Sequence, residues 1–196
     1  MDAALATRLL TSMGWKPTAA TLPAVISEFQ RGWHLGPPLA IDGKLGPKTK
    51  AALQVSLDRR HAGKPDMSAN FSAKEFLCKC GGKYKGCVRI RIHRALLSGL
   101  EQYRLTVGNV AVVSGYRCPQ HNAAVGGATS SQHVYGAAAD VEPVSLYGAV
   151  AKLRRFSGIG YQKASKKVRH VDVRHLSGNN TTGGTPDRPT MWVYGA

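Results

Sequence analysis

The sequence predicts an α+β protein built in two parts, a three-helix unit at the N-terminus and a small-sheet domain after it. Apolar residues recur at helical spacing over the first 62 positions, whereas short β-branched runs dominate the later part. Apolar residues make up 43% of the 196-residue chain, which is enough to form a core. No run of 18 apolar residues exists, so the sequence contains no transmembrane segment.

Three helices are expected in the N-terminal part. Residues 3–13 place leucines on one face, a second helix starts near Pro23, and a third starts at Pro47 in its first turn. The segment GPPLAIDGKLGP between the last two is a loop by its glycine and proline content. The polar stretch that follows the third helix predicts a linker. The expected division is therefore 1–62 for the helical domain, 63–70 for the linker and 71–196 for the second domain.

The second domain combines one long helix with a small sheet. Ser72 and Glu75 have the spacing of a capping box, and RIRIHRALLSGLEQYR predicts a helix after a short extended start. Strands are expected in NVAVVSG, AAADVEP and KVRHVDVRHL, and KLRRFSGIGY is expected to form a helix end and a turn. The tail SGNNTTGGTPDRPT is expected to be a long polar loop.

The chain is strongly basic. Lys and Arg number 27 against 11 acidic residues, a formal net charge of +16, which favours polyanionic partners. The basic residues are spread along the chain, and zinc-finger spacing and RNP-type strands are absent, so the charge does not indicate nucleic-acid binding. Acidic cell-wall polymers, anionic lipid and lipopolysaccharide remain as classes of partner.

Four cysteines are present, and three of them lie in FLCKCGGKYKGC. The four are Cys78, Cys80, Cys87 and Cys118. One or two disulfides, which would place the protein in an oxidising compartment, are the first interpretation. Free thiols, or a structural zinc whose fourth ligand comes from a distant segment, are the alternatives.

A cluster of polar, titratable residues stands among small ones in SGYRCPQHNAAVGGATSSQHVYGAAADVEP. A loop at His133, a turn at Gly136 and a strand ending at Asp140 can bring the two side chains together. In RHVDVRHL, His170 and Asp172 share one face of a strand with Arg174, while the valines take the other. Converging His and carboxylate ligands with a position left for water are typical of zinc hydrolases.

The N-terminal part resembles the peptidoglycan-binding module of bacterial and phage wall-lytic proteins. The resemblance rests on SEFQRGWHL followed by AIDGKLGPKTKAAL. It implies a helical wall-binding module, with wall-binding positions at Phe29, Gln30, Asp42 and Gly43.

The second part resembles the M15 peptidase family, zinc D-Ala-D-Ala carboxypeptidases and peptidoglycan endopeptidases that include phage endolysins. SGYR, S-x-H-x-x-G-x-A-x-D and HVDVR carry this resemblance over about residues 70–176. EFLCKCGG and SGYRCPQHN resemble the branch with the small α+β fold shared with the hedgehog signalling domain. The H-E-x-x-H helix of other zinc proteases is absent.

The M15 resemblance implies a Zn²⁺ cofactor and a set of site residues. The zinc ligands would be His133, Asp140 and His170. Arg117 would hold a substrate carboxylate or stabilise the oxyanion, because its planar guanidinium pairs with carboxylates and keeps its charge. The residues expected to contact substrate are Arg117, Ser131, Gln132 and Tyr135.

The general base is less well defined by the sequence. Many relatives have H-x-H where this chain has H-x-D, so two alignments follow. In the preferred one His170 binds zinc and Asp172 assists catalysis; in the other the two roles are exchanged. Glu142 and His175 are the other candidate bases. His121 is expected at the surface or behind the ligands.

The expected function is that of a peptidoglycan hydrolase of the endolysin type, cutting a peptide bond in the stem or cross-bridge. A D-Ala-D-Ala carboxypeptidase and a non-catalytic, zinc-containing wall-binding protein are the alternatives. A nucleic-acid protein would rest on charge alone. MDAALATRLLTSMGW has no secretory signal pattern. We therefore expect a protein that is made in the host cytoplasm and acts in the periplasm or cell wall. A monomer is also expected.

Overall fold

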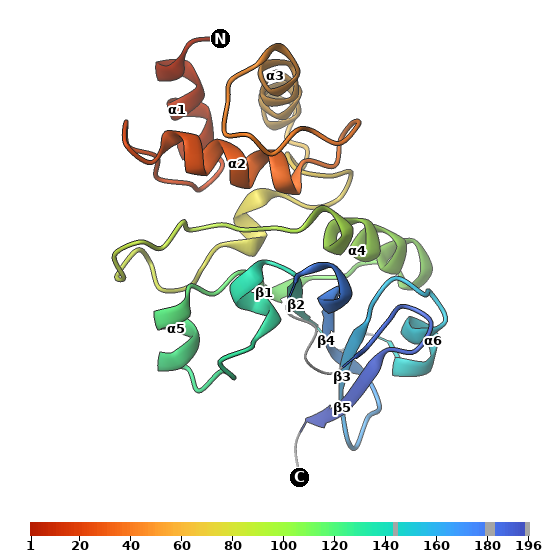
Figure 1. Ribbon diagram of the computed structural model, residues 1–196. Helices are drawn as coiled ribbons and strands as arrows, with labels where there is room; N and C mark the ends of the chain where they lie inside the picture. Colours follow the sequence, from red (N-terminus) through yellow and green to blue (C-terminus); the bar gives the residue numbers. More distant parts are fainter. Residues whose placement is uncertain (143–144, 179–182, 195–196) are drawn as a thin grey trace.

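The computed structural model describes residues 1–142, 145–178 and 183–194. Three helices, α1 (Ala3–Ser12), α2 (Leu22–Gly32) and α3 (Pro47–His61), lie at one end of the molecule, and the sheet lies at the other (Figure 1). No helix among the described residues is long and apolar enough to cross a membrane. The three expected N-terminal helices are therefore present, within about a residue of their expected bounds.

Asp2 caps α1 by accepting a hydrogen bond from the Leu5 amide at 2.8 Å, and Pro47 opens α3. The polar residue Gln30 of this part has a structural role. The Gln30 side chain accepts hydrogen bonds from the amides of Asp42 and Gly43, at 3.0 and 2.9 Å. It donates to the Asp42 carboxylate at 2.9 Å and to the Thr49 hydroxyl at 3.0 Å. This network fixes the loop between α2 and α3.

The expected wall-binding positions consequently need correction. Phe29 is fully buried in the core and Gln30 is 3% exposed. Gly43 is buried with φ +70°, and a Cβ there would lie 2.7 Å from the Pro23 carbonyl oxygen. Gln30 and Gly43 shape the loop and Phe29 packs in the core, so none of the three presents a side chain at the surface, whereas Asp42 is exposed.

The expected linker is packed into the protein. Asp66, Met67 and Ser68 are fully buried, and Met67 accepts a hydrogen bond from the His34 amide at 3.1 Å. The Asp66 carboxylate pairs with Arg60 at 2.7 Å. The polar composition of this segment predicted exposure, but its polar atoms are satisfied internally. Whether 1–62 and 71–196 are separate domains stays a prediction.

The C-terminal part is a five-stranded sheet in the order β1-β2-β4-β3-β5. Its strands are β1 (Val112–Ser114), β2 (Ala138–Val141), β3 (Gly158–Gln162), β4 (Val168–Asp172) and β5 (Thr190–Tyr194). The β3–β5 pair is parallel and the other three pairs are antiparallel. A small sheet with helices confirms the α+β class.

Three further helices belong to the described residues of this part of the chain. They are α4 (Arg94–Val107), α5 (Pro119–Ala124) and α6 (Tyr147–Ala151), with short 3₁₀ turns η1 (Ala73–Phe76), η2 (Gln132–Tyr135) and η3 (Arg174–Leu176). Leu96, Leu97 and Leu100 of α4 share one hydrophobic core with Ile159 and Val171 of the sheet. In Figure 1, α4 lies between the N-terminal helices and the sheet. The capping box of Ser72 and Glu75 is present at η1.

Two strands differ from the expectation. The segment read as a helix end and turn contains β3, and the end of the expected polar loop gives way to β5 at Thr190. Part of that loop, 179–182, lies outside the described residues. Gly158 and Gly160 suggested a turn, but they are required for packing. A Cβ at Gly158 would lie 2.3 Å from the Asp172 carboxylate, and one at Gly160 would lie 2.4 Å from the Tyr194 ring.

Candidate metal centre

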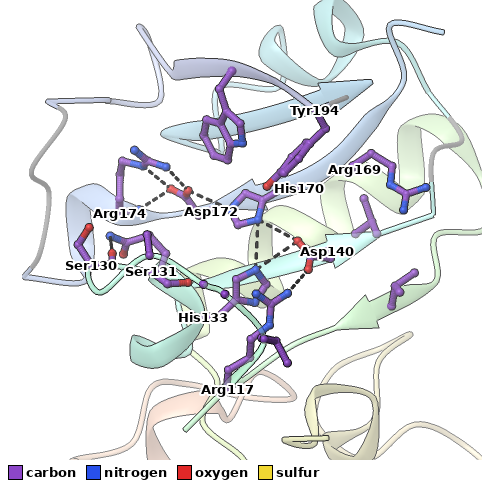
Figure 2. A pocket seen from close by; sticks show the side chains of 18 of the residues that line it. Arg117, Ser130, Ser131, His133, Asp140, Arg169, His170, Asp172, Arg174 and Tyr194 are labelled. Carbon is purple, nitrogen blue, oxygen red and sulfur yellow. Dashed lines mark hydrogen bonds and ion pairs between the residues drawn. The ribbon is translucent and has the colours of Figure 1, made fainter. Parts of the chain in front are cut away.

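A cavity of about 840 Å³ opens over the sheet, and the polar cluster lines its wall (Figure 2). β2 and β4 pair so that Asp140 and His170 are directly opposite each other. His133 comes from η2, which ends at Gly136 in the left-handed region with φ +67°. A Cβ at Gly136 would lie 2.5 Å from the Arg91 carbonyl oxygen, so glycine is required at this turn.

The ligand atoms of three side chains converge in this wall. His133 Nε2 lies 3.2 Å from both Asp140 Oδ1 and His170 Nδ1, and His170 Nδ1 lies 3.0 Å from Asp140 Oδ1. Ligands about 2.0–2.1 Å from a tetrahedral zinc would be separated by about 3.3 Å. The three separations match that spacing.

The tautomers of both histidines direct lone pairs toward one point. His133 Nδ1 is 2.7 Å from the Gly115 carbonyl oxygen, so Nδ1 must carry the proton and Nε2 a lone pair. His170 Nε2 faces the Asp172 carboxylate at 3.1 Å, so it donates and leaves Nδ1 for the other side. Two nitrogen lone pairs and a carboxylate oxygen facing one another require a cation between them. This donor set of two imidazoles and one carboxylate suits zinc.

The pKa values of these groups agree with that arrangement. Burial lowers the pKa of His133. Burial also acts against a charge on His170, but hydrogen bonds to Asp140 and Asp172 outweigh it and raise its pKa. For Asp140, burial opposes ionisation, yet its contacts with the imidazoles of His133 and His170 hold its pKa well below the usual range. In the absence of a metal, a proton on His170 supplies the positive charge that the cluster requires.

Each ligand is also held from behind. Arg117 forms an ion pair with Asp140 Oδ2, on the carboxylate oxygen that does not face the histidines, and donates from Nε to Ser114 at 3.2 Å. Asp172 is fully buried between His170 and Arg174, whose Nη2 lies 2.6 Å from Asp172 Oδ2. Outer partners of this kind fix the orientation of metal ligands.

The placement of Asp172 favours a positioning role, and its expected role as the catalytic base stays a prediction. It lies against the Nε2 edge of His170, whereas the ligand atoms converge at Nδ1. Since Arg174 and His170 occupy its oxygens, Asp172 is placed to position His170 rather than to accept a proton at the metal. The exchanged alignment, with Asp172 as the ligand, is disfavoured, because the converging set contains His170 and not Asp172.

The other expected residues divide between the cavity and its surroundings. Arg117, Ser131 and Gln132 line the cavity, and Tyr135 packs against the hydrophobic core instead. Glu142 and His175 are not among the described residues that line the cavity. His175 hydrogen-bonds Ser157 at 2.8 Å, so the two alternative bases lie away from the ligands.

Sequence reasoning missed part of the cavity wall. Trp192 and Tyr194 come from β5, and the Trp192 ring lies 5.0 Å from both the His170 ring and the Arg174 guanidinium. Alternating aromatic residues in TMWVY were the available signal for this strand. Further residues missed are Ser130, Arg169 and, as a cavity-lining side chain, Arg174.

Comparison with known proteins agrees with the site. A family profile described as Peptidase M15 matches residues 69–172, more than half of the chain. The chain is 29% identical over 171 residues to the zinc D-Ala-D-Ala carboxypeptidase of Streptomyces albus G, covering 74% of this chain and 67% of that protein. All three converging ligands lie within the matched region. The chain belongs to the peptidase M15 family, and zinc is its cofactor.

Proposed function

We propose that this protein is a peptidoglycan hydrolase that cuts a peptide bond of the stem or cross-bridge. The observation that supports it most directly is the convergence of His133, Asp140 and His170 in the wall of an open cavity. The named activity of the Streptomyces relative points to the same class of substrate. We further propose that the protein is a phage-type endolysin, made in the host cell and acting on the wall.

The residues that line the cavity would have different roles in peptide hydrolysis. His133, Asp140 and His170 would hold the zinc, which when bound lowers the pKa of water and polarises a carbonyl. Arg117 keeps Asp140 in place and presents its guanidinium to the cavity, where a substrate carboxylate or developing oxyanion can pair with it.

Tyr194 adds a hydrogen-bond donor to the same wall. Burial raises the pKa of its hydroxyl, so the group stays protonated at neutral pH and can donate to a substrate oxygen. Ser131 and Gln132 line the opposite, loop-built side of the cavity, where they can bind the peptide backbone.

Digestion of purified peptidoglycan tests this proposal. We expect new amines and shortened fragments by mass spectrometry, loss of release after chelation, and recovery with zinc. His133→Ala should abolish release, whereas His121→Ala, outside the cavity lining, should not. Intact peptidoglycan after incubation with zinc-loaded wild type would instead favour the non-catalytic wall-binding protein.

Carboxypeptidase action is the second candidate, favoured by the Streptomyces relative and by guanidinium groups of Arg117 and Arg169 in the cavity lining. These cations suit a terminal carboxylate. The same digest separates the two activities. Free D-alanine without loss of cross-links indicates a carboxypeptidase, and new termini within cross-linked fragments indicate an endopeptidase.

We also propose that the N-terminal helices anchor the enzyme to the wall. A second cavity of about 330 Å³ lies on this part and is lined by leucine and basic side chains, whereas the motif residues Phe29, Gln30 and Gly43 are buried. Its lining residues are Leu5, Arg8, Leu9, Ser12, Leu57, Arg60 and His61. Such a tether raises the local substrate concentration without changing the active site.

Cosedimentation with peptidoglycan tests the anchor. We expect Arg8→Ala to weaken binding of the whole protein, and Lys163→Ala, a change on the sheet side, to leave it nearly unchanged. The net charge of +16 also predicts that binding falls as salt rises from low to physiological ionic strength. Equal binding by Arg8→Ala and wild type would show that this cavity does not contact the wall.

A further inference from the structure

We propose that the four cysteines hold a second, structural zinc ion, separate from the catalytic cluster. Cys78, Cys80 and Cys87 belong to the loop after η1, and Cys118 is the residue that precedes α5. The four sulfur atoms lie within 4.8 Å of one another. This site is independent of the proposed peptidoglycan activity.

The spacing of the sulfur atoms suits a shared metal. Cys80 Sγ and Cys87 Sγ are 3.6 Å apart, and all four thiols are free in the structure. A disulfide requires about 2.05 Å, whereas sulfurs about 2.3 Å from a tetrahedral zinc are about 3.8 Å apart. Structural zinc sites typically have four protein ligands, so that no coordination position is left for water.

Backbone amides support the sulfur atoms as they do in thiolate sites. The Cys118 amide donates to Cys78 Sγ at 3.4 Å, and the Gly82 amide donates to Cys80 Sγ at 3.4 Å. Gly81 and Gly82 have φ +67° and +91°, a conformation that turns the second amide back to the sulfur. Hydrogen bonds of this kind favour the charged thiolate over the neutral thiol.

The charge around the cluster is complementary to a metal thiolate. Four thiolates and one Zn²⁺ carry a net charge of about −2, whereas two disulfides carry none. The segment from Cys78 to Arg89 contains Lys79, Lys83 and Lys85 and has no acidic residue. A negatively charged zinc thiolate centre would therefore reduce the repulsion among these lysines, whereas neutral disulfides would not.

Arg89 provides an independent observation. Its guanidinium nitrogens Nε and Nη1 are buried and have no hydrogen-bond partner among the described residues. Nη1 lies against the cysteine loop, 2.9 Å from where a Cβ on Gly82 would be. The Arg89 carbonyl accepts from the Cys78 amide at 2.8 Å, so the residue is fixed beside the sulfurs. Arg89 as a whole is half-buried, and its two unpaired, buried nitrogens favour a nearby anion, which the zinc thiolate centre would supply.

The site would join the cysteine loop to the segment before α5. Residues 78–89 contain no helix or strand, and Cys78, Cys118 and Tyr116 form a small apolar cluster of their own. Zinc would tie this loop to the segment that carries Arg117, next to Cys118. Figure 1 shows the loop, in yellow-green, reaching away from the body of the molecule above α5. Metal binding would displace four thiol protons and involve no change of oxidation state.

Metal analysis of the purified full chain is the first test. We expect two zinc ions per chain in the wild type, one in His133→Ala and one in Cys80→Ser. Cys87→His should keep both ions, because histidine is also a zinc ligand but cannot form a disulfide. This variant separates metal binding from disulfide formation even where Cys80→Ser folds poorly.

Spectroscopy and thiol chemistry complete the test. Cobalt-loaded His133→Ala should show an intense thiolate-to-cobalt charge-transfer band that adding Cys80→Ser removes. Denaturation with a chelator under non-reducing conditions should make four thiols available for alkylation. Disulfide-linked peptides in the purified protein, or one zinc ion per chain that Cys80→Ser does not affect, would overturn the proposal.

Discussion

At the scale of single residues, each metal ligand is oriented before a metal arrives. Gly115 holds His133 through Nδ1, Arg117 holds Asp140 through Oδ2, and Asp172 holds His170 through Nε2. The atoms left over are those that converge. Because the side chains are already ordered, zinc binding loses little conformational entropy on their account.

Asp172→Asn separates a positioning role from a role as the base. The change weakens the acceptor for His170 and the pair with Arg174, so we expect zinc affinity to fall about 10- to 100-fold. At saturating zinc most of the activity should return, with the acid limb of the pH profile unchanged. A metal titration followed by kcat and KM over a range of pH provides the measurement.

The matched control is Asp187→Asn, an exposed carboxylate paired with Arg154. It should leave both zinc affinity and kcat near the wild-type values. Unaltered zinc affinity in Asp172→Asn, together with a rate loss of about 10²–10⁴ that zinc does not restore, would identify Asp172 as the base instead.

Zinc uptake should depend on pH through His170. Its pKa in the folded, metal-free protein lies above the ordinary 6.5, so near pH 6.5 it carries a proton that zinc must displace. Zinc affinity should therefore rise with pH until the folded pKa is passed, and zinc binding near pH 6.5 should release protons. Calorimetric titration in two buffers of different ionisation enthalpy measures that release.

His170 should give the stability of the metal-free protein the opposite pH dependence: its contribution to the free energy of unfolding should fall as pH rises. A raised pKa in the folded state contributes stability that is fully present below pH 6.5 and is lost as pH rises through the folded pKa. Urea unfolding of chelated protein across this range checks the sign. Greater stability contributed by His170 at high pH would contradict the assignment of its proton.

At the scale of elements, the site depends on strands that meet in one register. β4 alternates between core and cavity, with Val171 fully buried and His170 and Asp172 on the cavity side, as its sequence predicts. β3 contributes Gln162 to the cavity lining, but it has glycines, Gly158 and Gly160, opposite Asp172 and His170. Its glycines leave the space that Asp172, Trp192 and Tyr194 fill from the neighbouring strands.

Gly160→Ala should therefore be costly. The added methyl would meet the Tyr194 ring at 2.4 Å and Trp192 Nε1 at 2.7 Å, which forces β5 to shift. We expect a loss of about 1–3 kcal/mol in the free energy of unfolding, together with reduced activity. Denaturant unfolding and the tryptophan emission spectrum measure the two effects.

Gly148→Ala is the matched control. It lies within α6 and has nothing within 4 Å of the added methyl, so alanine should be neutral or stabilise by up to about 1 kcal/mol. Equal effects of the two changes on stability would show that β3 does not require glycine for packing.

The sequence could predict those elements whose signals are local. The helices follow from apolar spacing and caps, and the ligands from their spacing within short segments. β3 was missed because glycines are common in turns. Here Gly158 and Gly160 lie in a strand, where side chains of the neighbouring strands occupy the space above them. The burial of Asp66 was missed because its partners, Arg60 and the Ala73 amide, become neighbours only after folding.

In the candidate site, Asp172 was placed correctly on its strand face. Its role, however, depends on which ring nitrogen of His170 it contacts, and the sequence does not specify that contact.

At the scale of the whole molecule, the helical part and the sheet part meet through buried polar contacts. Glu28 of α2, 5% exposed, accepts from Arg91 at 2.9 and 3.0 Å. The Trp15 indole donates to the Ile90 carbonyl at 3.1 Å, and Arg94 donates to the carbonyls of Trp33 and Gly36. Apolar residues of both parts belong to one hydrophobic core. These contacts predict that the two parts unfold together.

Glu28→Gln tests this coupling. It removes the charge that pairs with Arg91, and we expect a loss of about 1.5–3 kcal/mol in the free energy of unfolding. Asp58→Asn, at an exposed position of α3, should change the stability by less than about 0.5 kcal/mol. Calorimetry of the wild type should show a single transition with equal calorimetric and van't Hoff enthalpies. Two separate transitions would show that the parts fold independently.

The shared interface limits how this protein could be recombined with others. A chimera that grafts the first sixty residues onto a foreign catalytic half would leave Glu28 and the Trp15 indole buried without Arg91 and the Ile90 carbonyl. Transplanting either half therefore requires copying the 90–94 stretch with it. Shuffling across this junction is expected to yield insoluble chains where freely tethered modules would yield working hybrids.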